Sequence, residues 1–251
     1  MIRECCIGLL LGGSLAAAAS GETAGEVMRR HIRASGGGKY LSLKTVRMSG
    51  RWFVTEDKVE AVVMELVPAS HQLRMEITQE GGTDIRVYDG HLAWVLLRSH
   101  GDTSADRLTG DGLRQMKDLA HFQGRLFDYL SGGGEVEYLE KGELDGVLVF
   151  QLRLPDTDGE ETTVTIDARS YLELKEERAW SGHGETMVWR TRYSDFRSAQ
   201  GLTLPYKIEM SFKETAGVGI MRWSDLERFA IDKIELNVDL PASRFARPKN
   251  P

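Results

Sequence analysis

The sequence predicts a mainly β protein in which a single curved antiparallel sheet forms an unclosed half barrel, with two or more helices as a lid. Three observations support this fold class. Apolar and polar residues alternate with a period of two in one segment after another, as in strands with one buried face. Helical spacing occurs in only two stretches of any length. No linker divides the chain, so we expect residues 21–251 to form one domain.

Residues 1–20 have the order of a secretory signal peptide, with Arg3 first, an apolar stretch at 5–15 and small residues at 16–20. The apolar stretch is shorter than the roughly 20 residues of a membrane-spanning helix. We therefore expect cleavage after one of the small residues at 18–20, and export to the periplasm. An uncleaved anchor, or a different start of the chain, is the alternative.

Cleavage would remove Cys5 and Cys6, so the mature chain would have no disulfide and no thiolate for catalysis or metal binding. A lipoprotein would instead need a cysteine directly after the apolar stretch. The formal net charge is −6. This mildly acidic balance disfavours a general electrostatic attraction to nucleic acid.

The first element of the expected mature chain is an amphipathic helix at 22–34, which the run Ser35-Gly36-Gly37-Gly38 ends. From Thr45 onward the period changes to two. The expected strands, eleven or twelve in number, are 45–54, 59–67, 71–79, 85–88, 91–98, 135–141, 147–154, 162–167, 171–180, 185–194, 204–212 and 229–238. Asp89-Gly90 lies between two of them and is a strong hairpin signal.

A second helix interrupts the strands at 111–130, where apolar residues recur three or four positions apart. The glycine run at 132–134 ends it. A flat sheet of eleven strands would be about 50 Å wide at roughly 4.8 Å per strand, and two helices about 10 Å across would not cover it. The sheet must therefore curl, which leaves a concave apolar interior.

Large and often flexible side chains are predicted to line this interior. They are Met48, Trp52, Met64, Leu66, Leu73, Met75, Trp94, Leu96, Phe150, Leu152, Leu174, Met187, Trp189, Tyr206, Ile208, Met210 and Phe212. Methionine adapts to partners of varied shape. Two interpretations remain open from the pattern alone: these side chains fill one another's gaps as an ordinary core, or they line an opening of ligand size.

Catalytic motifs are missing from the sequence. The six histidines form no metal-binding spacing, GGGK at 36–39 lacks the other residues of a phosphate loop, and no GxSxG occurs. We expect no cofactor and no metal. Paired carboxylates such as Glu176-Glu177 are expected on the solvated surface, and most strand arginines are expected to point outward.

Several segments resemble a known family. They are ASGG at 34–37, LKTVRMSG at 43–50, DARSYLE at 167–173, YSDFR at 193–197, GLTLPY at 201–206 and FARP at 245–248. The chain resembles the outer membrane lipoprotein-sorting proteins, a broad branch related to the periplasmic lipoprotein carrier LolA. The resemblance implies an unclosed β-barrel with a helical lid, whose hydrophobic interior receives acyl chains.

The leading hypothesis is a periplasmic carrier or chaperone in outer-membrane lipoprotein sorting, which binds lipoprotein acyl chains or another lipid and meets an inner- or outer-membrane acceptor protein. The alternative is an envelope sensor or assembly module that binds another envelope protein through the same curved sheet, without lipid transfer. An enzyme acting on a lipid or glycan is a third hypothesis, disfavoured by the missing catalytic groups. One fold hosts several functions, so the resemblance does not choose among them.

Overall fold

The computed structural model describes residues 22–55, 57–132, 135–157, 160–182, 185–215 and 223–249. The predicted signal peptide at 1–20 lies outside these ranges. In the described part of the chain, no helix has the length and apolar character needed to cross a bilayer.

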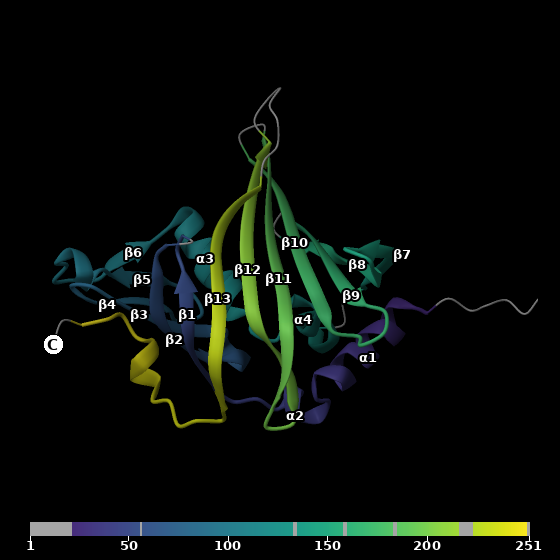
Figure 1. Ribbon diagram of the computed structural model, residues 1–251, viewed down its shortest axis with the longest axis horizontal. Helices are drawn as coiled ribbons and strands as arrows, with labels where there is room; N and C mark the ends of the chain where they lie inside the picture. Colours follow the sequence, from purple (N-terminus) through teal and green to yellow (C-terminus); the bar gives the residue numbers. More distant parts are fainter. Residues whose placement is uncertain are drawn as a thin grey trace, which may run out of the picture.

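One antiparallel sheet of 13 strands forms the protein, in the order β6-β5-β4-β3-β2-β1-β13-β12-β11-β10-β9-β8-β7 (Figure 1). The strands are β1 (Val46–Phe53), β2 (Val59–Val67), β3 (Gln72–Gln79), β4 (Gly82–Tyr88), β5 (Ala93–Leu96), β6 (Asp106–Leu108), β7 (Glu137–Leu144), β8 (Val147–Thr157), β9 (Glu160–Asp167), β10 (Glu173–Gly182), β11 (Glu185–Ala199), β12 (Leu202–Thr215) and β13 (Trp223–Leu236). The predicted fold class is confirmed. The short strand β6 had no counterpart among the predicted strands.

The strand order explains how the sheet acquires a lid. Almost every strand pairs with its neighbour in sequence, and β1 pairs with β13. Strands β6 and β7, although consecutive in sequence, therefore lie at opposite ends of the sheet. The chain between them has to cross the sheet, and it carries α3 (Gly110–Ala120) and α4 (Arg125–Gly132). In Figure 1 both helices lie behind the long central strands.

Bulges bend the sheet at its centre. The register shifts between Ser49 and Gly50 where β1 meets β13, and between Met210 and Ser211 where β12 meets β13. A bulge adds one residue to one strand and increases the local twist. At Gly50 a side chain would collide with the carbonyl oxygen of Ala230, so the close approach of β1 and β13 requires glycine.

Two helices precede the sheet. Helix α1 (Ala24–Ser35) begins with a capping box, in which Thr23 and Glu26 bond each other's backbone N–H groups, and Gly36 ends it at φ 130°. The short helix α2 (Gly38–Leu41) follows. The prediction of a helix at 22–34 is confirmed, whereas α2 was not predicted.

The single helix predicted at 111–130 is wrong, because the chain breaks between α3 and α4 at residues 121–124. Gly124 has φ 76°, a conformation that favours glycine, and a Cβ there would lie 3.0 Å from Glu173 Oε2. Two hydrogen bonds join Gln123 and Tyr40. The Gln123 side chain donates to the backbone carbonyl oxygen of Tyr40, and the backbone carbonyl oxygen of Gln123 accepts from Tyr40 Oη at 2.8 Å. These contacts replace helical bonds and turn the chain.

Buried apolar residues form three clusters. The largest gathers side chains of β1–β4 and β11–β13 with Met116 and Ala120 of α3. The second joins Val27 and Met28 of α1 and Leu126 of α4 to β8 and β9. The third, around Val87, lies on β4 and β5.

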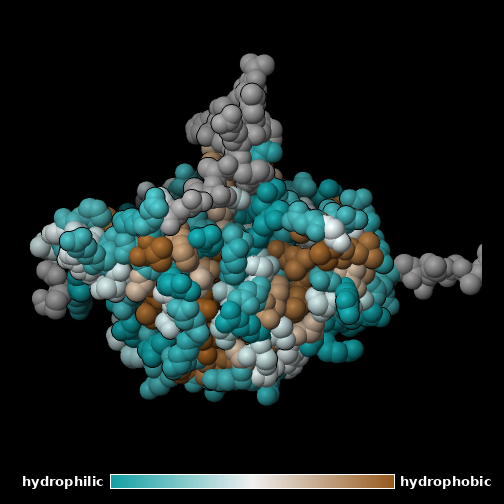
Figure 2. Space-filling model, viewed as in Figure 1, coloured by the Kyte–Doolittle hydropathy of each residue, from teal (hydrophilic) through white to brown (hydrophobic). Residues whose placement is uncertain are grey.

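The C-terminal segment runs back along β2 and β3 and contains the 3-10 helix η3 (Ala242–Phe245), drawn in yellow in Figure 1. Two further 3-10 helices, η1 (Pro68–Ser70) and η2 (Arg98–His100), lie in turns. Figure 2 shows the face of the molecule seen in Figure 1, where hydrophilic residues surround separate hydrophobic patches.

Candidate functional site

The concave side of the sheet, under α3 and α4, holds most of the residues predicted to line the interior. Eleven of them belong to the largest cluster or pack against it: Met48, Trp52, Met64, Leu66, Leu73, Met75, Trp189, Tyr206, Ile208, Met210 and Phe212. Phe150 and Leu152 lie in the second cluster. Met187 is opposite Trp180 in the β10–β11 ladder, and Leu174 lies at a bulge of β10.

Trp94 and Leu96 are placed elsewhere. They pack with Ile85, Val87 and Ala105 in the third cluster, on the face of β4 and β5 opposite to Tyr88 and Ala93. The C-terminal segment reaches this cluster, because Arg247 donates a hydrogen bond of 2.6 Å to the carbonyl oxygen of Ala105. The structure therefore does not bring these two residues together with the others.

Two small cavities remain between the sheet and the lid. One, of about 60 Å³, is bounded by Met48, Met64 and Met210 of the sheet and by Leu119 and Phe122 of the lid. A second, of about 50 Å³, lies beside Tyr40 and Glu173. Phe122, Tyr193 and Pro205 line both cavities. Ligand pockets usually measure about 300–1,000 Å³, so the lid is closed on an interior that its own side chains nearly fill.

Three polar side chains of α3 tie the lid to the sheet. Arg114 bonds Glu160 of β9, Gln115 donates to Glu227 of β13 at 2.7 Å, and Asp118 bonds Arg178 of β10. The three strands lie at different places in the sheet. Helix α3 is thus held from several sides.

The bonds around Asp118 extend into a buried ionic network. Its second carboxylate oxygen accepts from Arg125 at 2.9 Å, and Arg178 also donates to Glu160 at 2.9 Å. Arg125 Nε lies 3.4 Å from Glu176 Oε1. The side chains of Arg178 and Asp118 are 3% and 8% exposed. We name Asp118, Arg125, Glu160, Glu176 and Arg178 the ionic network.

The expectation that Glu176 lies on the solvated surface is wrong. The bulge at Glu173 and Lys175 sets the register of β10 so that Glu176 and Arg178 share the inner face with Trp180. No inward arginine was identified from the sequence. The alternation of Glu176, Arg178 and Trp180 was the available signal, but an alternating polar pair usually marks the outer face of a strand.

Burial changes the protonation of this interior. It raises the pKa of Asp118 to about 6, against the opposing effect of Arg178 and Arg125. Burial, together with the nearby Glu176, raises the pKa of Glu173 well above its usual value. Glu173 Oε1 has no hydrogen-bond partner among the described residues. Burial, the neighbouring carboxylate and the missing hydrogen bond all favour the protonated form of Glu173.

A larger hollow opens to solvent beside α3. Its volume is about 690 Å³, and it is bounded by α3, by every member of the ionic network except Glu176, and by three histidines, His71, His91 and His121. The rings of His71 and His121 lie 4.4 Å apart, centroid to centroid. Within the described residues, no group of three or more His, Cys, Asp or Glu side chains is arranged to hold a metal.

These features define a class of architecture: an unclosed antiparallel half barrel, closed on its concave side by a helical lid over an apolar interior. A LolA superfamily protein from Nitrosomonas europaea has a similar structure, with a TM-score of 0.56 and 16% identity over 90% of this chain and 99% of that one. The chain thus has the fold of the LolA superfamily.

Two further solved structures overlap more weakly. An uncharacterized conserved protein from Thermus thermophilus has a TM-score of 0.34 and 8% identity over 90% of this chain and 95% of that one. MucB in complex with MucA has a TM-score of 0.23 and 8% identity over 86% of this chain and 100% of that one. No protein-family model and no curated protein matches the sequence.

Proposed function

We propose that this protein is a periplasmic carrier or chaperone that binds the acyl chain of lipoproteins, or of another lipid, and serves outer-membrane lipoprotein sorting. Binding is by burial, without covalent chemistry. The observation that carries the proposal is the apolar cavity between Met48, Met64 and Met210 of the sheet and Leu119 and Phe122 of the lid.

The composition of this cavity suits a flexible chain. Three of its side chains are methionines, which are unbranched and adapt to irregular partners. Burying a methylene group contributes about 0.8 kcal/mol, so an acyl chain is a strong ligand for such a surface. A protein evolved only for stability would gain more from side chains with fixed rotamers.

The lid has to move for an acyl chain to enter, because the cavity of about 60 Å³ is only about twice the volume that one water molecule occupies in liquid water. The break at residues 121–124 divides the lid into two helices, which the bond between Arg125 and Asp118 joins. Polar bonds fix α3 to β9, β10 and β13, in addition to the apolar packing of Met116 and Ala120. Charged side chains re-solvate when they separate, so these bonds are a suitable latch for a lid that opens.

Native mass spectrometry tests the proposal on protein exported to a periplasm and purified without detergent, followed by lipid extraction. We expect a bound lipid and an N-terminus near residue 21. Titration with cis-parinaric acid, a fluorescent fatty acid, then measures chain binding directly. A protein without lipid that also fails to bind the probe would overturn the proposal, as would a stable protein partner retained with no lipid exchange.

A matched pair of variants locates the site. Met210→Trp fills the cavity, whereas Ile85→Trp overpacks the third cluster on the other face of the sheet. Each costs about 1–3 kcal/mol of stability. Only Met210→Trp should weaken probe binding, by about tenfold or more, since it displaces several methylene groups. Equal binding by the two variants would place the chain elsewhere.

A further inference from the structure

The open hollow beside α3 carries an excess of positive charge. Arg114, Lys117, Arg125 and Arg178 line it, against the carboxylates of Asp118 and Glu160. Glu176, which is outside the lining, pairs with Arg125, so the excess charge is that of Lys117. Lys117 is exposed and has no ion-pair partner among the described residues. The volume of about 690 Å³ is within the range of small-molecule sites, roughly 300–1,000 Å³.

Two arginines that line the hollow keep an unused hydrogen-bond donor. The buried Nε atoms of Arg114 and Arg178 donate no hydrogen bond within the described residues, whereas Arg125 Nε faces Glu176 Oε1 at 3.4 Å. The Arg178 side chain is 3% exposed, so bulk water reaches it poorly. Buried donors in native proteins nearly always find an acceptor. Two guanidinium groups with an unused donor, together with the exposed Lys117, favour a ligand that has several acceptor oxygens.

The hollow is adjacent to the apolar cavity. Asp118 and His121 line both, and they belong to the last turn and the end of α3. An amphiphile whose chain lies under the lid would therefore place its polar end beside the arginines. A phosphate group supplies about 1.5–2 negative charges and oxygens that arginine binds in pairs.

We propose that this hollow is a phosphate-binding site, which receives the phosphorylated head group of the amphiphile whose chain occupies the interior. The inference deepens the proposed function and rests on it for the chain. The same site chemistry would also accept a free phosphate ester, and the experiment separates these sources.

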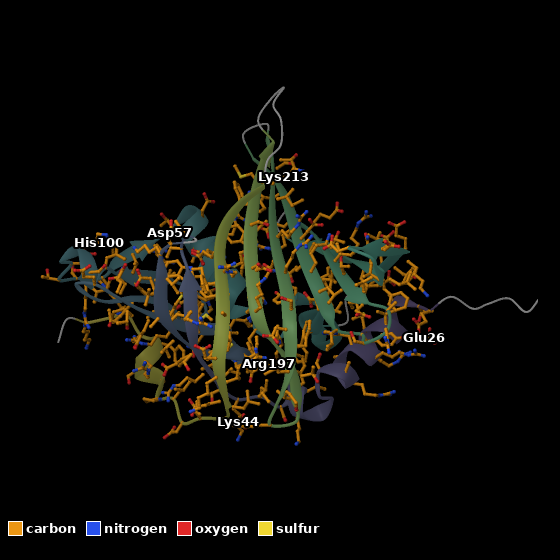
Figure 3. The ribbon with its side chains drawn as sticks, viewed as in Figure 1. Glu26, Lys44, Asp57, His100, Arg197 and Lys213 are labelled. Atoms are coloured by element: carbon orange, nitrogen blue, oxygen red, sulfur yellow. The ribbon has the colours of Figure 1, made fainter. Side chains whose placement is uncertain are left out.

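Isothermal titration calorimetry of the mature protein tests the site with three probes: lysophosphatidic acid, the monoacylglycerol with the same chain, and glycerol phosphate. The double variant Lys117→Gln/His91→Gln removes an exposed ammonium group and an exposed imidazole that line the hollow, and it leaves the ionic network intact. Its matched control is Lys44→Gln/His100→Gln, which changes the same residue types at the periphery (Figure 3).

We expect the protein to bind lysophosphatidic acid about tenfold more tightly than the monoacylglycerol, as charge-assisted bonds allow. The Lys117→Gln/His91→Gln variant should reduce this preference by about threefold or more, and the control should keep it. Arg114→Lys, at the more exposed arginine of the lining, keeps the charge but loses the guanidinium group, so it should weaken phosphate binding without weakening binding of the monoacylglycerol.

The outcomes separate the two proposals. Equal affinity for the two lipids would overturn the phosphate site and leave the carrier function standing. Binding of glycerol phosphate as tight as that of lysophosphatidic acid, with the same sensitivity to the variants, would support the site but assign it to a soluble ester. Failure of all three probes would overturn both proposals.

Discussion

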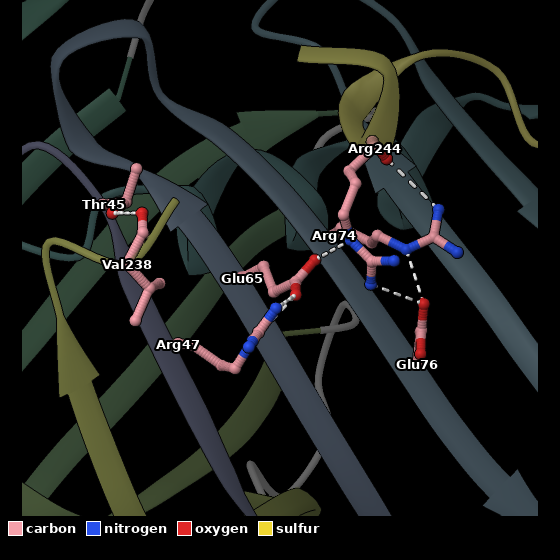
Figure 4. A network of polar contacts seen from close by, with 7 residues as sticks. All are labelled: Thr45, Arg47, Glu65, Arg74, Glu76, Val238 and Arg244. Atoms are coloured by element: carbon pink, nitrogen blue, oxygen red, sulfur yellow. Dashed lines mark hydrogen bonds and ion pairs between the residues drawn. The ribbon is translucent and has the colours of Figure 1, made fainter. Parts of the chain in front are cut away.

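Arg244 of η3 donates a hydrogen bond to Glu65 of β2, a carboxylate that is only 2% exposed and 179 positions away in sequence (Figure 4). Arg47 bonds the other oxygen of Glu65 at 2.7 and 2.9 Å, and Arg244 also reaches Glu76 at 2.8 Å. The buried charge of Glu65 is therefore shared by two arginines. This fastens the C-terminal segment to β2 and β3.

Replacing Arg244 by methionine should destabilise the fold. Methionine keeps some apolar packing but leaves one oxygen of a buried carboxylate without its charged donor, so we expect a loss of about 1–3 kcal/mol in urea denaturation. Arg197→Met is the matched control, because its ion pair with Asp195 is about half exposed (Figure 3). That change should stay within about 0.5 kcal/mol. Equal losses for the two variants would contradict the fastening role.

Asp118→Asn should reveal a pH dependence of the latch. The folded pKa of Asp118, about 6, is above its unfolded value near 3.9. The folded protein therefore binds this proton more tightly than the unfolded chain does. The protonated carboxyl group contributes its full stabilisation of the fold below about pH 3.9, and this contribution is lost as the pH rises through 6. The free energy of unfolding of the wild type, relative to Asp118→Asn, should fall by about 1–3 kcal/mol between pH 4 and pH 7.

Urea denaturation at several pH values in this range measures the difference. Asp111→Asn, an exposed change in the first turn of the same helix, is the control and should show no such fall. If the free energy of unfolding of the wild type, relative to Asp118→Asn, rose with pH instead, the ion pairs would have a larger effect on the pKa of Asp118 than burial has.

Glu173 and Glu177 of one strand should respond to pH with opposite signs. Burial and Glu176 raise the pKa of Glu173, so its contribution to stability is lost as the pH rises through the folded pKa. For Glu177, burial acts to raise the pKa, but bonds from Lys175 and Arg190 outweigh it and the pKa lies below the usual value. That contribution is present above the unfolded pKa and is lost as the pH falls.

Thermal unfolding between pH 4 and pH 9 compares the two glutamine variants with the wild type. Glu173→Gln should match the wild type in acid and become the more stable protein at high pH. Glu177→Gln should be the less stable protein at neutral pH and match the wild type in acid. Parallel pH profiles would show that the two carboxyl groups do not differ in this way.

The sheet was predictable because strand periodicity reports which face is buried. Met48 and Met64, both predicted to point inward, are cross-strand partners in the observed ladder. The face itself was less predictable at β5, where Trp94 packs on the side that the C-terminal segment covers. Both faces are apolar there, so alternation alone cannot choose between them.

The ionic network and the break in the lid depend on contacts distant in sequence. Arg178 is stabilised by Asp118, 60 positions away, and Gln123 by Tyr40, 83 positions away. The local sequence pattern places a charged strand residue in solvent, and it continues a helix through Phe122. Both expectations fail because the local pattern does not include the partner that is distant in sequence. The topology supplies that partner, since α3 and α4 must cross the sheet between β6 and β7.

Phe122→Ala should convert the closed interior into an open one. The side chain of Phe122 lines both the cavities of about 60 and 50 Å³, so we expect its removal to join them under the lid. Loss of packing should cost about 2–4 kcal/mol, less than for a fully buried phenylalanine because Phe122 is half-buried. Apolar cavities made in this way bind apolar ligands.

The variant should therefore be less stable and yet bind cis-parinaric acid more tightly, by several-fold, because less side-chain packing must be displaced before the chain enters. Trp94→Ala is the control, since it removes a half-buried aromatic ring from the third cluster on the opposite face. It should lose stability without gaining affinity. If both variants bound the probe more tightly, general loosening would explain the gain; if neither did, the joined cavity would not be the route of the chain.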